Sequence, residues 1–207
     1  MKKIDTLFLK QLYLVFVFNL LILFIIALQY IKFLENIDGF FLKPYLIVTA
    51  TSHFFLIGAL PLLFSILIYF VTQSKIVTKT INIILSVFIL VVVKLDATIF
   101  EQFRYHISPI VLKLVFGKRA SDIFQFSFTN IVLALLFIVG LVSLQLFFYF
   151  LSNKKVNQNS NLRLKPTLLL FTLFVLLSNV IYAWSDANYF RPVTQFKMSF
   201  LYLSINS

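Results

Sequence analysis

Long apolar runs without charge dominate this sequence and restrict what it can fold into. Between Lys10 and Lys32 the sequence reads QLYLVFVFNLLILFIIALQYI, with no acidic or basic residue. A helix needs about 20 apolar residues to cross the hydrocarbon core of a bilayer. Only 12% of the residues are charged and 61% are hydrophobic, whereas a soluble domain has roughly 25% charged residues. The chain is therefore predicted to be an integral membrane protein.

The charged residues divide the chain into five such runs, so the predicted fold is an all-α bundle of five transmembrane helices. Proline inside the second run and Lys94 in the third do not exclude helices there, provided that the Lys94 side chain snorkels to the membrane surface. The expected spans are residues 12–31, 51–70, 80–99, 124–151 and 166–185. We assign residues 1–196 to one transmembrane domain and residues 197–207 to a short C-terminal tail.

The segment between the third and fourth spans is too polar to cross the bilayer and too apolar for a plain loop. Ser108 and Pro109 resemble a helix N-cap followed by proline at the first helical position. We expect the third helix to end near Tyr105 and a short helix to follow over residues 109–117, ending at Gly117. This helix would lie in the membrane interface or pack on the bundle, and the sequence leaves both arrangements open.

Charge and cysteine content narrow the function classes. The net charge is +11, but the 18 Lys and Arg residues are scattered between apolar runs, which is typical of helix anchors rather than of a nucleic-acid surface. Half of them lie in the segments that precede the first span, join the second to the third, and join the fourth to the fifth. The other half lie in segments of about twice that total length, so charge density predicts a cytoplasmic N-terminus and a periplasmic C-terminus. No cysteine is present, which excludes disulfides and thiolate chemistry.

Candidate catalytic residues are few. The two histidines, His53 and His106, lack the spacing of a metal-binding motif, so we expect no metal site, no cofactor and no catalytic residue. His53 falls within the second span, where a polar side chain is expected to hydrogen-bond to another helix. The acids Asp96, Glu101, Asp122 and Asp186 fall at the predicted outer edges of the spans, where a carboxylate is tolerated at little cost.

Two ordered motifs resemble the membrane domain of PbgA/YejM-type inner-membrane proteins. SDANYFRPVT is similar to that family's D-A-N-F/Y-x-R-P-I/V-T pattern, and LDATIFEQFRYHISPIVLKLV to its D-x-x-x-F-x-x-F-x-x-H-x-N-P-I-V segment. Ser108 stands where the family pattern has asparagine. The matched residues are taken as family-motif and interfacial sites: Asp96, Phe100, Phe103, His106, Pro109, Asp186, Asn188, Arg191 and Pro192.

The resemblance implies five N-terminal helices in the bacterial inner membrane, followed in full-length relatives by a linker and a sulfatase-like periplasmic domain of the alkaline-phosphatase superfamily. This chain stops at Ser207, so the linker is expected to be truncated and the superfamily's nucleophile and metal ligands absent. A natural truncation, a disrupted reading frame and a fragment all remain open.

By the same resemblance, the chain is expected to be a non-catalytic module in lipopolysaccharide and outer-membrane lipid homeostasis. Its expected partners are membrane lipids, namely lipid A or an acidic phospholipid, and a membrane-embedded adaptor protein. The alternative is the membrane anchor of a lipid-headgroup transferase or hydrolase whose catalytic domain lies outside this chain. Nucleic acid is not expected as a partner.

Overall fold

The computed structural model describes residues 5–31, 42–103, 106–107 and 128–158, together with positions 173, 176, 177 and 180. In these residues the regular structure is α-helix, with no strand, which agrees with the all-α fold class. The four helices are α1 (Thr6–Ile31), α2 (Leu42–Thr72), α3 (Lys75–Phe103) and α6 (Phe128–Gln158). All four are long and apolar enough to cross a membrane. The predicted interfacial helix, and the predicted fifth span apart from the four isolated positions, lie outside the described residues.

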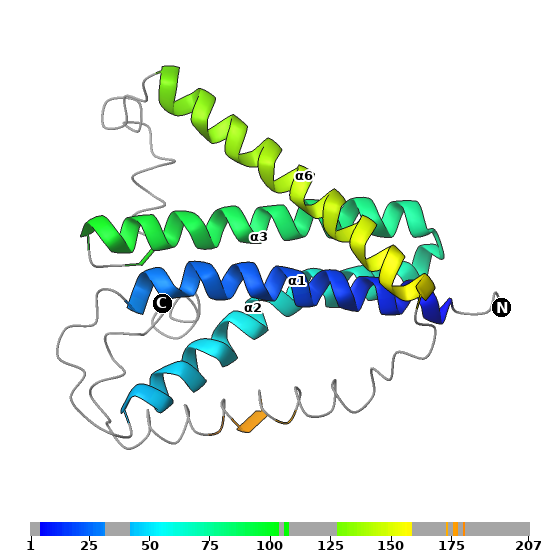
Figure 1. The fold of residues 1–207 in the computed structure, drawn as a ribbon, viewed down its shortest axis with the longest axis horizontal. Coiled ribbons are helices and arrows are strands. Elements are labelled where there is room, and N and C mark those ends of the chain that lie inside the picture. Colours follow the sequence, from blue (N-terminus) through cyan, green and yellow to red (C-terminus); the bar gives the residue numbers. More distant parts are fainter. Residues whose placement is uncertain are drawn as a thin grey trace.

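The helices form a bundle around α1, which contacts α2, α3 and α6 (Figure 1). Successive helices α1, α2 and α3 run in alternating directions, and α6 crosses α1 and α3 at an angle. The main apolar core lies between α1, α2 and α3, where Leu23, Phe54 and Leu90 are almost fully buried. A second cluster joins α1 to α6 through Leu12 and Phe148.

Helix boundaries follow local sequence signals. Asp5 caps α1, because its Oδ1 accepts hydrogen bonds from the backbone N–H of Leu7 at 2.9 Å and of Phe8 at 3.2 Å. Between α2 and α3 the chain reverses over two residues. Gln73 has φ 51°, the left-handed conformation common after a helix C-terminus, and the Ser74 hydroxyl accepts from the N–H of Val77 as the next N-cap. This tight turn makes α2 and α3 an antiparallel pair.

Helix α3 starts five residues earlier than the expected span and continues past Lys94 to Phe103. Lys94 is half-buried, and its Nζ donates a hydrogen bond to Oε1 of Gln29 on α1 at 2.9 Å. The ammonium group therefore has a protein acceptor at a depth where an isolated charge would be unfavourable.

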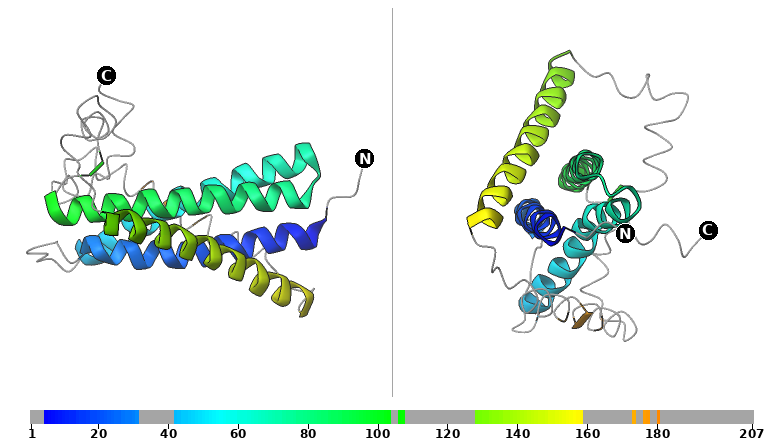
Figure 2. Two further views of the ribbon diagram at one scale, coloured as in Figure 1. Left: turned by 90° about the horizontal axis from the view of Figure 1, so that it is seen from above. Right: turned by 90° about the vertical axis from the view of Figure 1, so that its right-hand side faces the viewer.

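Helix α6 is packed along only half of its length. Leu141, Gln145, Phe148, Tyr149 and Ser152 are buried, whereas residues 131–140 are exposed except for Val132, which is half-buried. Both views in Figure 2 show the start of α6 leaning away from the other helices. Exposed leucine and isoleucine side chains are expected where a helix faces lipid.

Candidate functional site

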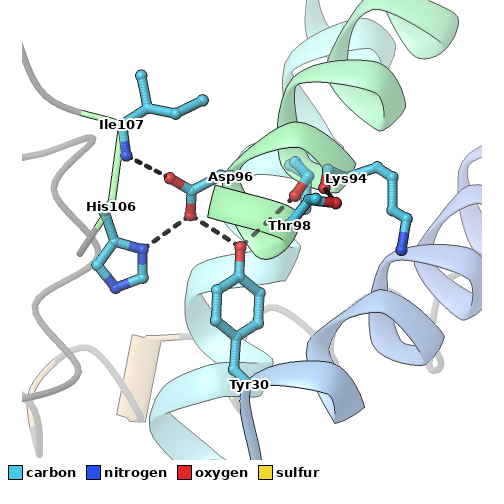
Figure 3. A network of polar contacts seen from close by, with 7 residues as sticks. Tyr30, Lys94, Asp96, Thr98, His106 and Ile107 are labelled. Atoms are coloured by element: carbon cyan, nitrogen blue, oxygen red, sulfur yellow. Dashed lines mark hydrogen bonds and ion pairs between the residues drawn. The ribbon is translucent and has the colours of Figure 1, made fainter. Parts of the chain in front are cut away.

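The carboxylate of Asp96 is the centre of a buried polar network at the end of the bundle where α1 and α3 terminate (Figure 3). Asp96 is only 4% exposed. Its Oδ2 accepts a hydrogen bond from the hydroxyl of Tyr30 on α1 at 2.8 Å and lies 2.8 Å from Nδ1 of His106. Its Oδ1 accepts from the backbone N–H of Ile107 at 2.7 Å. An ionised carboxylate can only accept hydrogen bonds, so Nδ1 of His106 carries the proton in this contact.

Aromatic rings enclose the His106 imidazole. It stacks on Phe100 of α3, with ring centroids 4.7 Å apart and an interplanar angle of 17°, and lies 5.7 Å from the Tyr30 ring. Tyr30 also contacts Phe54 of α2, with a centroid distance of 6.2 Å. The network therefore ties α1, α2 and α3 to the two described residues that follow α3. Its chemistry is that of an anchor, which fixes where the chain leaves α3.

A second polar set lies inside the bundle, halfway along the helices. Asn19 of α1 and Gln145 of α6 exchange amide hydrogen bonds in both directions, and Nδ2 of Asn19 also donates to the hydroxyl of Ser86 on α3 at 3.3 Å. Gln145 is fully buried. Because the membrane core offers no water, such interhelical bonds are the only partners available to these amides.

A third group of hydrogen bonds links α2, α3 and α6 nearer the start of α1. Nδ2 of Asn82 donates to the Ser65 hydroxyl at 2.9 Å and to the Pro61 carbonyl at 3.2 Å, and Oδ1 of Asn82 accepts from the Tyr149 hydroxyl at 2.9 Å. The backbone carbonyl of Tyr149 accepts from Gln11 of α1 at 3.2 Å. Among the described residues, no buried side-chain nitrogen or oxygen lacks a partner.

Neither the Asp96 network nor the intramembrane groups resembles a metal centre. Within the described part of the chain, no group of three or more His, Asp or Glu side chains could hold a metal ion. The buried polar atoms are occupied by one another, so these networks position helices.

The end of the bundle where α1 begins is basic. Lys75 of α3 forms an ion pair with the capping carboxylate of Asp5, and this contact is the main cause that lowers the pKa of Asp5 below its ordinary value. Lys79 lies over the Tyr149 ring at 5.5 Å, and Lys155 lies over the Phe18 ring at 5.7 Å. The lysine stems cover aromatic side chains while their charged groups stay at the helix ends.

Comparison with known proteins places the chain in a family. Residues 10–203 match the family model described as domain of unknown function DUF3413, which covers nearly the whole chain. The chain belongs to this family. The DUF3413 chain is 25% identical over 183 residues to the inner membrane protein YejM of Salmonella typhimurium and to that of Salmonella typhi. It is 26% identical over 189 residues to an uncharacterized protein of Haemophilus influenzae.

These alignments cover 86% to 88% of this chain but only 30% to 31% of each relative. The chain thus spans about a third of the length of the curated relatives it matches. The family match confirms the resemblance to the YejM-type N-terminal membrane domain, and the four apolar helices fit a multi-pass protein of the inner membrane.

The DUF3413 structure brings three of the predicted site residues together: Asp96, Phe100 and His106. Asp96 does not lie at an exposed edge as expected. It is buried and stabilised by three hydrogen-bond donors, whereas Glu101, one turn later, is exposed. His53 is half-buried on α2 and close enough to His106 for the two imidazoles to interact electrostatically. For Phe103 the structure describes only the backbone, as the last residue of α3. Pro109, Asp186, Asn188, Arg191 and Pro192 lie outside the described residues.

Sequence reasoning missed Tyr30 and the intramembrane amides. A signal for the amides exists, because Thr78, Asn82 and Ser86 recur every four residues within an apolar run and therefore share one face of α3. Asn19 and Gln145 are single polar residues in their surroundings. Nothing in the sequence indicates that they pair with each other, 126 residues apart.

Proposed function

We propose that this chain is the non-catalytic membrane module of a YejM-type protein involved in lipopolysaccharide and outer-membrane lipid homeostasis. It acts by contacting membrane lipid and by binding a membrane-embedded partner through its helices. In this proposal the N-terminus is cytoplasmic and the C-terminus periplasmic.

The observation that carries the proposal is the family match over residues 10–203, which is confined to the membrane part of longer inner-membrane relatives. The helical surfaces support contact with lipid and with other helices. Leu135, Leu136 and Val139 of α6 are about 60% exposed, and Leu63, Leu67 and Phe70 of α2 are half-exposed or more. In a bilayer these faces meet acyl chains or the helices of another membrane protein.

A non-catalytic role is supported by the internal use of the buried polar groups. Asp96, His106 and Tyr30 bond to one another and to backbone groups, and the intramembrane amides do likewise. A catalytic acid or base instead needs to reach a substrate proton within hydrogen-bond distance.

Deletion of the gene and complementation with the wild-type chain test this proposal. The deletion should change the cellular level of the first committed enzyme of lipid A synthesis, and complementation should restore it. An affinity-tagged chain, solubilised in mild detergent, should co-purify with a membrane-embedded adaptor. Unchanged enzyme levels together with the absence of any co-purifying membrane protein would refute the proposal.

A second candidate function is the membrane anchor of a lipid-headgroup transferase or hydrolase. The coverage of only 30% of the YejM sequences favours considering it, because the rest of such a protein would carry the chemistry. Sequencing the adjoining DNA in all three frames tests it. An open frame encoding a sulfatase-like metal site would support the anchor role, and a frame without metal-ligand residues would exclude it.

A further inference from the structure

An apolar groove lies between α3 and the splayed half of α6. Its volume is about 440 Å³, and it is lined by Thr80, Ile83, Ile84, Val87, Phe88, Val91, Ile138 and Val142. The groove opens sideways, since Ile84 and Phe88 on its α3 wall are 60% and 63% exposed. Both walls belong to membrane-spanning helices, so the groove faces lipid rather than water.

The groove is a wedge that closes toward the start of α3. There the bonds of Asn19 and Gln145, and of Asn82 and Tyr149, hold α6 against the bundle. Toward the end of α3 the two helices diverge (Figure 1). A wedge that narrows inside the membrane matches an acyl chain, which enters from one leaflet and ends near the bilayer centre.

Size argues against a protein helix as the occupant. One turn of α-helix with its side chains has a diameter of 10–12 Å and a rise of 5.4 Å, which gives roughly 400–600 Å³. The groove would hold about one such turn, whereas a spanning helix has several. A narrow, flexible chain of methylene groups can fill the same space along its length.

The wide end of the groove carries a cation. Lys94 follows Val91 by three residues and Val87 by seven, so it lies on the same face of α3, one turn beyond the groove. Its ammonium donates to the neutral amide of Gln29. The nearby Asp96 carboxylate extends away from Lys94 toward Tyr30, His106 and Ile107 (Figure 3). An ionisable residue inside a membrane span marks a binding site for a charged group by default.

We propose that this groove binds one acyl chain of an anionic glycerophospholipid whose phosphate contacts Lys94. The lipid comes from the leaflet at the end of the bundle where α3 terminates. This deepens the lipid contact of the proposed function, since it names the lipid class and the helices that hold it.

Lipid retention by the purified full chain tests the inference. The protein is extracted from membranes, exchanged into detergent with equal amounts of phosphatidylglycerol and phosphatidylcholine, and the bound lipid is measured by native mass spectrometry. Wild type should retain phosphatidylglycerol preferentially. Lys94→Gln should reduce this preference about fivefold, the effect expected for one lysine near an anionic headgroup. Lys154→Gln, at an exposed lysine of α6 far from the groove, is the matched control and should leave the preference unchanged.

Two groove variants test the acyl chain separately from the headgroup. Val91→Trp fills the groove and should abolish retention of both lipids, and Phe88→Ala, at an exposed side chain that the fold does not need, should weaken retention of both. Circular dichroism confirms that each variant is helical. Equal retention of the two lipids by wild type, or unaltered retention by both groove variants, would overturn the inference. Neither result would bear on adaptor binding or on lipid A enzyme levels, which test the proposed function.

Discussion

At the scale of single residues, Asp96 shows how a carboxylate is accommodated at a membrane-embedded helix end. The hydroxyl of Tyr30, the imidazole of His106 and the backbone N–H of Ile107 replace the water that the ion loses on burial. Each contact has charge-assisted geometry, with distances of 2.7 to 2.8 Å. The family motif that contains Asp96 and His106 therefore has a physical meaning, because it fixes the chain as it leaves α3.

Replacement of Asp96 by asparagine should destabilise the bundle. The amide NH₂ would face a donor at one of the two oxygen positions, which leaves a buried donor without an acceptor and costs about 1–3 kcal/mol. Unfolding of the purified protein in mixed micelles measures this change. Tyr30→Phe removes one bond only and should cost less, about 1 kcal/mol. Wild-type stability of Asp96→Asn would show that the carboxylate is not needed to anchor this end.

At the scale of helices, neutral amides rather than charges hold α6 in place. The Asn19–Gln145 pair and the Asn82–Tyr149 bond lie where α6 meets the bundle, and its other half has few contacts. Because lipid is as apolar as leucine, polar bonds can define one position of a helix where apolar packing would allow several.

A double-mutant cycle on Asn19→Leu and Gln145→Leu should give a coupling energy of about 0.6 kcal/mol, with about 1.7 kcal/mol as the upper bound for such pairs in membranes. Ser143→Ala is the control, since its hydroxyl is exposed and bonds only to Val139 within α6. Additive effects of the two leucine substitutions would contradict the pairing. The free energy of unfolding in micelles is again the measurement.

Helix α2 approaches α1 closely at Gly58. A Cβ atom at this position would lie 2.8 Å from Cδ2 of Leu20 and 2.9 Å from Cδ1 of Leu23, both of which are buried. Gly58→Leu should therefore overpack the interface and destabilise the protein by about 1–3 kcal/mol. Gly140→Leu is the matched control, because nothing lies within 4 Å of its position. Equal stability of the two variants would show that α1 and α2 separate without cost.

At the scale of the whole molecule, the two ends of the bundle differ in charge. One end carries lysines on three helices and a single described acid, Asp5, which caps α1 and pairs with Lys75. The other end carries the Asp96 network. This asymmetry agrees with the density of basic residues in the sequence, and it is the physical basis for the proposed orientation.

The Asp5 contact predicts a pH dependence of stability. Because its pKa is lower in the folded protein than the ordinary value of 3.8, the contact stabilises the fold above that value, and the contribution is lost as pH falls below it. The ion pair is largely exposed, so its contribution is at most about 1 kcal/mol. Unfolding of wild type and Asp5→Asn, followed from about pH 6 to about pH 3, should show the acid-dependent loss in wild type only. Parallel curves would exclude it.

Reporter fusions test the path of the chain across the membrane. Alkaline phosphatase, active only outside the cytoplasm, should be inactive when fused after Gln73 and active when fused after Phe103, since α3 separates these positions. A fluorescent protein that matures only in the cytoplasm should give the reciprocal result. The same reporter result at both positions would contradict α3 as a membrane span.

The sequence alone determined that this chain forms membrane-spanning helices, because a charge-free run of 20 or more apolar residues has no other stable environment. It also identified the motif containing Asp96, Phe100 and His106. Only the tertiary structure decided that Asp96 is buried, that Tyr30 completes its hydrogen bonds, and that Asn19 pairs with Gln145. Apolar periodicity sets the length of a helix, whereas a polar partner far away in the sequence depends on how helices cross and rotate against one another. In an apolar solvent small interhelical contacts decide that geometry.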